Sequence, residues 1–185
     1  MRNRPPRWSQ SPERAALLAL YAEADAVLEG WTCACSRAGV GGTPEAQCCH
    51  FAVTGREPYP TAVELEEVRH AIRAAAFTPA APAAAATGAS RARDPRKLPM
   101  ADLRPCPLLS AEGRCRVYAS RPFGCRTYFC DHAEAPWGAR KKLPRDAVNA
   151  IGRRIADLSA RFAPRDPHPR PLVKALTGGG RRTSA

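Results

Sequence analysis

Residues 106–130 read CPLLSAEGRCRVYASRPFGCRTYFC, and their four cysteines are spaced C-x8-C-x9-C-x4-C. Between the second and third of these cysteines lies Ser120-Arg121-Pro122, a combination typical of a turn that folds the chain back on itself. Thiolates that bind one metal centre must converge from different directions, which requires such a fold-back. A second set of four cysteines lies upstream, at Cys33, Cys35, Cys48 and Cys49. We therefore expect a fold organised around two cysteine groups that meet.

Thiolate ligands select zinc, copper(I) or iron–sulfur clusters. The adjacent pair Cys48-Cys49 and the irregular spacings fit a cluster better than the paired C-x2-C knuckles of most zinc ribbons. The sequence thus predicts iron, as an iron–sulfur cluster of the 4Fe-4S kind, with zinc as the alternative. The number of centres stays open. The predicted metal ligands are Cys33, Cys35, Cys48, Cys49, Cys106, Cys115, Cys125 and Cys130.

Arginines are interleaved with these cysteines, at Arg114, Arg116, Arg121 and Arg126. A thiolate-held centre carries net negative charge, so neighbouring guanidinium groups can compensate that charge or donate hydrogen bonds to sulfur. The alternative is that the four side chains are merely exposed. Because it directly follows a predicted ligand, Arg126 is the predicted cofactor-binding arginine.

Three helices are indicated by their end signals and apolar periodicity. The first has Ser11 as N-cap, Pro12 at its first position and Gly30 after its end. The second opens with the capping box Thr61-Ala62-Val63-Glu64 and is stopped by Pro79. The third runs over 144–162 with apolar residues in an i, i+3, i+4 rhythm. The expected fold is small, mainly α and metal-stabilised, with about three helices around a loop-rich cysteine core.

The domain organisation follows from composition. Residues 1–10 are predicted to be a flexible N-terminus, and residues 11–162 a single cysteine-cluster metal-binding domain. Within it, residues 78–97 are rich in alanine, proline and arginine and are predicted to be a low-complexity insertion. Residues 163–185 contain few large apolar residues and are predicted to be a basic disordered tail.

The chain is strongly basic, with 29 Lys and Arg against 17 Asp and Glu, a net charge of +12. The excess is concentrated after residue 139, as a solvated tail or as a surface for an acidic partner. Nucleic acid is a less favoured partner because aromatic residues make up only 6% of the chain and none is interleaved with the basic tail. The run Ala15–Ala22 reads as helix rather than as a secretory signal, and no stretch has the length of a membrane span. We expect a cytoplasmic protein without membrane association, whose cysteines are ligands rather than disulfides.

Several of these residues together resemble the YkgJ-type cysteine-cluster family, described as a zinc- or iron-chelating domain with a CxxCxxCC signature. The resemblance covers roughly residues 31–130 and departs from the family in its first part, which here is C-x-C-x12-C-C. It implies a metal or iron–sulfur centre held by the cysteines and implies little about a reaction. The matching segments are Cys48-Cys49, Thr61, Glu64, Cys106-Pro107-Leu108-Leu109, residues 113–118, Arg121-Pro122 and residues 125–128.

Two classes of function remain open from the sequence. One is a metal-binding protein in electron transfer or redox-linked chemistry, with an unknown redox or protein partner. The other is a structural zinc module whose basic segments bind nucleic acid or another acidic partner. No phosphate-binding loop, dinucleotide fingerprint or nucleophile–base motif occurs in the sequence, so the catalytic residues are unknown and enzymatic activity is left open.

Overall fold

The computed structural model describes residues 7–31, 47–51, 56–79, 105–127 and 143–177. Within these ranges the protein is mainly helical and contains no β-strand, only two isolated β-bridges. The expectation of a mainly α protein is therefore confirmed. No helix in the described ranges is long and apolar enough to cross a membrane. The elements are η1 (Trp8–Gln10), α1 (Pro12–Val27), η3 (Gln47–Cys49), α3 (Ala62–Ala74), η4 (Tyr118–Ser120), α4 (Phe123–Arg126), α5 (Arg145–Phe162) and α6 (Leu172–Thr177).

The predicted starts of α1 and α3 are those that the structure has, whereas α1 ends at Val27 and α3 at Ala74, a few residues before the predicted stops Gly30 and Pro79. The Ser11 hydroxyl accepts a hydrogen bond from the Arg14 amide at 3.1 Å, and Pro12 occupies the first position of α1. At the start of α3, Thr61 and Glu64 form the predicted capping box. Such caps act locally, by satisfying amides that have no partner inside the helix, and are therefore readable from sequence.

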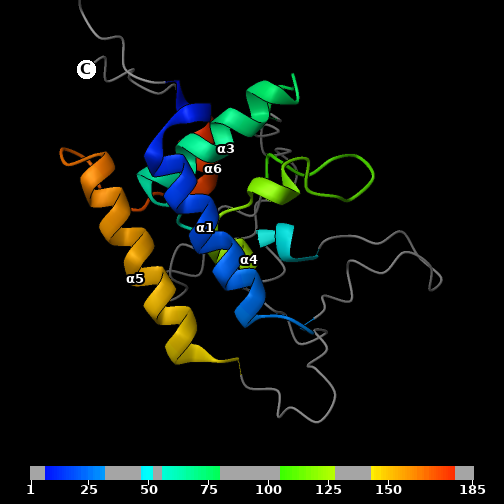
Figure 1. The fold of residues 1–185 in the computed structure, drawn as a ribbon. Coiled ribbons are helices and arrows are strands. Elements are labelled where there is room, and N and C mark those ends of the chain that lie inside the picture. The colour runs from blue at the N-terminus through cyan, green and yellow to red at the C-terminus, as the bar shows by residue number, and fades with distance from the viewer. Residues whose placement is uncertain (1–6, 32–46, 52–55, 80–104, 128–142, 178–185) are drawn as a thin grey trace, which may run out of the picture.

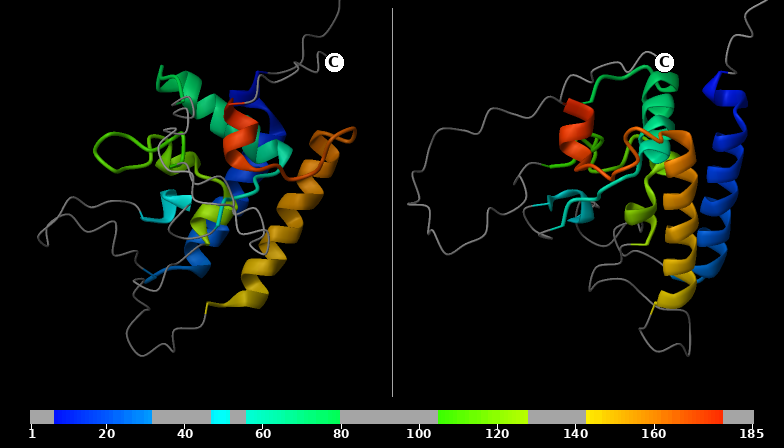
Figure 2. Two further views of the ribbon diagram at one scale, coloured as in Figure 1. Left: turned by 180° about the vertical axis from the view of Figure 1, so that it is seen from behind. Right: turned by 90° about the vertical axis from the view of Figure 1, so that its left-hand side faces the viewer.

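Helices α1 and α5 lie side by side and run in opposite directions, with the N-terminal part of α3 packed across them (Figures 1 and 2). Their apolar faces form the helical cluster, which includes a fully buried Leu17 and a nearly fully buried Tyr21, Ile151 and Ile155. Val63 is the residue of α3 that joins this cluster. Each buried aliphatic side chain of this kind contributes roughly 1.5–3 kcal/mol.

The opposite face of α3 packs against a second set of apolar residues, here named the cysteine-side cluster. Leu65 and Val68 of α3 belong to it, and no residue is shared with the helical cluster. Because residues two or five positions apart on a helix face different sides, α3 contacts both clusters. The cysteine-side cluster consists of Phe51, Leu65, Val68, Cys106, Leu108, Val117, Leu172 and Val173.

The segment predicted as a disordered tail is packed on the protein over part of its length. Within it, α6 lies beside α3 (Figures 1 and 2) and buries Leu172 completely. The preceding backbone pairs with the residues before α3, through Arg170 N to Pro60 O and Leu172 N to Pro58 O, both at 3.1 Å. Two apolar residues are too short a signal to show periodicity, which is why the sequence did not predict this helix. Residues 178–185 lie outside the described residues.

The N-terminus also differs from the expectation of flexibility over residues 1–10. Trp8 of η1 packs on the helical cluster, and its ring stands edge-on to Phe162 with centroids 5.4 Å apart. Its indole N–H donates to Glu67 Oε2 at 2.9 Å. Residues 1–6, and residues 80–97 of the predicted insertion, lie outside the described residues.

Candidate metal centre

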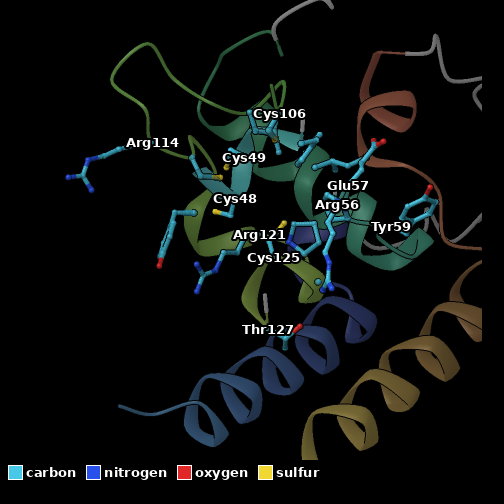
Figure 3. A pocket seen from close by; sticks show the side chains of 18 of the residues that line it. Cys48, Cys49, Arg56, Glu57, Tyr59, Cys106, Arg114, Arg121, Cys125 and Thr127 are labelled. Carbon is cyan, nitrogen blue, oxygen red and sulfur yellow. The ribbon is translucent and has the colours of Figure 1, made fainter. Parts of the chain in front are cut away.

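Five cysteines from three separate segments line one cavity of about 670 Å³ (Figure 3). Cys48 and Cys49 come from η3, Cys106 and Cys115 from the loop that follows residue 105, and Cys125 from α4. All five are free thiols. The structure thus brings both cysteine groups of the sequence to one place. Apolar side chains complete much of the wall, among them Phe51, Leu108 and Leu172.

The contact between the two cysteine groups is a backbone contact. The amide of Cys106 donates to the carbonyl oxygen of Cys49 at 2.7 Å, and His50 and Pro105 form an antiparallel β-bridge. Two segments more than fifty residues apart are thereby held in register. This contact fixes Cys49 and Cys106 as neighbours on the cavity wall.

A tight loop returns the chain from Cys106 to Cys115. The amide of Ser110 donates to the carbonyl oxygen of Arg114 at 2.8 Å, and the amide of Arg116 donates to that of Leu108 at 2.9 Å. Gly113 has φ of 72° in this loop, a conformation that residues with a Cβ rarely adopt. The loop therefore depends on a glycine in order to place Cys115 against the same cavity as Cys106.

The surroundings of the thiols favour their protonated form. Burial raises the pKa of Cys115 and Cys125 above the ordinary value. The hydrogen bond with Cys49 raises the pKa of Cys48, and the hydrogen bond with Cys106 raises the pKa of Cys49 to about 12. Any metal that binds here must displace thiol protons, as a divalent cation does when it stabilises thiolate.

Arg121 is the arginine whose charge acts on the thiols. It lowers the pKa of Cys48, Cys115 and Cys125, although burial and thiol–thiol contacts outweigh it. Its guanidinium lies over the ring of Tyr118, 4.1 Å from the centroid. Its Nε atom is buried and has no hydrogen-bond partner within the described part of the chain. A buried donor without an acceptor costs about 1–3 kcal/mol, and a metal-bound sulfur is an acceptor of the kind it lacks. The cysteines and this arginine therefore fit a thiolate-held centre.

Arg126 has a different environment from the one expected. Its Nη1 donates to both carboxylate oxygens of Asp25, the shorter contact being 2.7 Å, and its guanidinium lies 4.2 Å from the ring centroid of Tyr21. It also donates to the carbonyl oxygens of Arg121, at 3.1 Å, and Ala119. Arg126 is 7% exposed and does not line the cavity. Its described contacts are with protein groups, and the arginine beside the thiols is Arg121.

Cys33, Cys35 and Cys130 lie outside the described residues. Among the residues that are described, no group of three or more His, Cys, Asp or Glu side chains is arranged so that it could hold a metal ion. Five thiols thus share a cavity without closing around one ion-sized point.

Sequence reasoning missed the wall opposite the thiols, which Arg56, Glu57 and Tyr59 supply (Figure 3). The Glu57 carboxylate accepts a hydrogen bond from the Val173 amide at 2.7 Å, so this wall is tied to α6. No motif marks these residues, because they reach the cavity only through the pairing of residues 58–60 with residues 170–172.

Comparison of the chain with protein-family models, with curated proteins and with solved structures gave no match.

Proposed function

We propose that this chain is a metal-binding protein that holds an iron–sulfur cluster through clustered cysteines and acts in electron transfer or redox-linked chemistry. The observation that carries the proposal is the convergence of Cys48, Cys49, Cys106, Cys115 and Cys125 on one cavity. An iron–sulfur cluster supplies one-electron transfer when it is bound. The residues of the chain bind it, exclude water with the apolar wall, and place the charge of Arg121 beside it.

The choice of iron over zinc rests on the arrangement of the donors. A structural zinc ion needs four ligands at about 2.0–2.3 Å around one point. No three described side chains are arranged in that way, whereas five thiols surround a common volume. Such a donor set suits a centre of several atoms better than a single ion. Zinc remains the alternative because Cys33, Cys35 and Cys130 lie outside the described residues.

The same proposal includes metal stabilisation of the fold and membership of the YkgJ-type cysteine-cluster family. Residues 105–127 contain turns, bends, one-turn helices and isolated β-bridges, and only Cys106, Leu108 and Val117 among them belong to the buried cysteine-side cluster. Conformational entropy opposes the ordering of such a segment at about 1–2 kcal/mol per residue. Metal binding to thiolates contributes about 10 kcal/mol or more in small sites, which offsets part of this cost.

Anaerobic purification with metal analysis and a visible spectrum tests the proposal. We expect the protein to contain iron and acid-labile sulfide and to show the visible absorption typical of iron–sulfur clusters, either as isolated or after reconstitution. Replacement of single cysteines by serine should identify which of the eight are ligands. A colourless protein with stoichiometric zinc would move the assignment to the zinc module, and absence of both metals after reconstitution would reject a metal centre.

A further inference from the structure

Helix α3 carries two buried carboxylates, one turn apart, that both reach toward the cysteine segment. Glu64 is 3% exposed and Glu67 is 1% exposed. Carboxylates are almost never fully buried unless they are paired, because removing an ion from water is costly. The hydrogen-bond partners of these two groups therefore indicate what their burial achieves.

Glu67 connects the N-terminal segment to the cysteine segment. Its Oε2 accepts from Arg14 Nε at 2.7 Å and from Trp8 Nε1 at 2.9 Å. Its Oε1 accepts from the hydroxyl of Ser120 at 2.9 Å. Ser120 is the residue immediately before Arg121, so Glu67 holds one side of the Arg121-Pro122 turn.

Glu64 holds the other side of this turn. Its Oε2 serves the capping box, accepting from the Thr61 amide and hydroxyl at 2.8 Å. Its Oε1 accepts from the amide of Phe123 at 2.7 Å and from the Tyr21 hydroxyl at 3.3 Å. The Phe123 amide opens α4, the helix that bears Cys125. The two carboxylates thus bind the residues on both sides of Arg121-Pro122.

Arg126 supplies a third hold on the same turn. It donates to the carbonyl oxygens of Ala119 and Arg121, and Asp25 of α1 fixes its guanidinium. The turn is therefore held by side chains from α1, α3 and α4, while the Nε of Arg121 itself is left without a partner among the described residues. If these hydrogen bonds served stability alone, the buried Nε of Arg121 would be expected to have an acceptor within the protein, because an unsatisfied buried donor is destabilising.

We propose that Arg121 is the residue that donates a hydrogen bond to the cysteine-held centre, and that Glu64, Glu67 and Arg126 are positioning residues that fix it there. This inference rests on the proposed function. It assigns the charge compensation at the site to one guanidinium rather than to the four arginines interleaved with the cysteines. It also gives α3 a second role beyond packing, because the same helix aligns the cavity wall.

The sharpest variant is Ser120→Ala, which removes the link from Glu67 to the turn. It changes no charge and leaves the contacts of Glu67 with Arg14 and Trp8 in place. Ser110→Ala is the matched control, since Ser110 lies in the same cysteine segment without contact to α3 in the described structure. Glu64→Gln is the second variant: its single amide oxygen cannot serve both Thr61 and Phe123. Glu66→Gln, whose carboxylate pairs with Arg73 on the surface, is its control.

Amide hydrogen exchange on the full chain measures how strongly the Arg121-Pro122 turn is stabilised, and it does not depend on bound metal. We expect exchange of the amides of Arg121 and of residues 123–125 to accelerate about tenfold in Ser120→Ala and Glu64→Gln, the effect of one lost charge-assisted hydrogen bond. The two control variants should match the parent protein. Unchanged exchange in both test variants would overturn the positioning role.

The centre itself supplies the second readout. In an iron-loaded protein, Arg121→Gln should shift the reduction potential to more negative values, because loss of a nearby positive charge disfavours the added electron. Arg121→Lys should lie closer to the parent. Ser120→Ala should also shift the potential to more negative values, because Arg121 is less well held. Loss of a carboxylate charge alone, as in Glu64→Gln, would instead shift the potential to more positive values. If the metal is zinc, the second readout is the rate of zinc release to a chelator, which should be faster in Arg121→Gln and Ser120→Ala than in the parent protein.

The two proposals fail in different ways. A parent protein that takes up neither iron nor zinc contradicts the proposed function and the donor role of Arg121, while the exchange experiment still decides the positioning role. If the protein binds metal but neither Arg121→Gln nor Ser120→Ala changes the reduction potential or the rate of zinc release, this inference is wrong and the proposed metal centre is unaffected.

Discussion

The two sides of α3 are held together by different means. On one side, α1 and α5 pack long apolar faces into the helical cluster, so dispersion and the hydrophobic effect fix the structure. On the other side, the turn around Arg121-Pro122 lies beside the smaller cysteine-side cluster and is fixed by hydrogen bonds to the carboxylates of Glu64 and Glu67 and from the guanidinium of Arg126. Packing is tolerant of small changes in shape, whereas a hydrogen bond to a buried charge is not. The helical side can therefore support the protein while the cysteine side positions thiols.

The largest expected effect is that loss of the metal destabilises the cysteine segment while the helical cluster stays folded. Cys125→Ser should remove most of the contribution of metal binding, which is about 10 kcal/mol in small thiolate sites. Residues 105–127 should then become sensitive to protease, whereas α1 and α5 should keep their helical circular dichroism. Metal content and limited proteolysis check both points. A Cys125→Ser protein with full metal content and unchanged protease resistance would exclude Cys125 as a ligand.

The next effect compares equal truncations in the two clusters. Ile155→Ala and Leu172→Ala each empty a buried aliphatic site and should each cost about 2–5 kcal/mol in free energy of unfolding. Because Leu172 lines the cavity and Ile155 does not, only Leu172→Ala should also speed metal loss at a temperature where both variants are folded. Denaturant titration and chelator competition measure the two quantities. Equal metal loss in both variants would show that the clusters act as one unit.

A third prediction concerns acid sensitivity. Burial opposes ionisation of Glu67, but hydrogen bonds from Arg14, Trp8 and Ser120 outweigh it and hold the pKa of this carboxylate below its usual value. The stabilisation is therefore present above the unfolded-state pKa near 4.5 and is lost as pH falls through the lower folded-state pKa.

Glu67→Gln should accordingly cost about 1–3 kcal/mol at neutral pH and reduce the dependence of stability on pH in the acid range. Unfolding midpoints measured from pH 7 down to pH 3 test this. A variant with the same acid-induced loss of stability as the parent would show that other carboxylates determine it.

The smallest expected effect lies on the helical side. Arg154 of α5 donates to both carboxylate oxygens of Glu23 of α1 at 2.7 Å, and both side chains are about half exposed. Such pairs contribute about 0.2–1 kcal/mol, because water and salt screen them. A double-mutant cycle with Arg154→Gln and Glu23→Gln should give a coupling in that range, reduced at high salt. A coupling above this range would mean that polar contacts also fix the helical side.

The sequence by itself determined where α1 and α3 begin and which residues are the predicted ligands. The N-terminal ends of α1 and α3 follow from Ser11, Pro12, Thr61 and Glu64, because capping acts between residues three positions apart. The eight cysteines and their spacing indicated a thiolate centre before any contact was known. The apolar rhythm of α5 likewise indicated Val148, Ile151, Ile155, Leu158 and Phe162 as the core face, of which Ile151, Ile155 and Leu158 are buried.

The tertiary structure alone decided which arginine stands beside the thiols and what closes the cavity. Arg126 follows Cys125 in sequence, but successive residues of a helix point about 100° apart, so Arg126 faces α1 while Cys125 faces the cavity. Leu172 reaches the wall only through backbone pairing with residues more than a hundred positions away. Local signals extend over one helical turn, whereas these placements depend on long-range packing. Sequence reasoning could therefore single out the cysteines but not their surroundings.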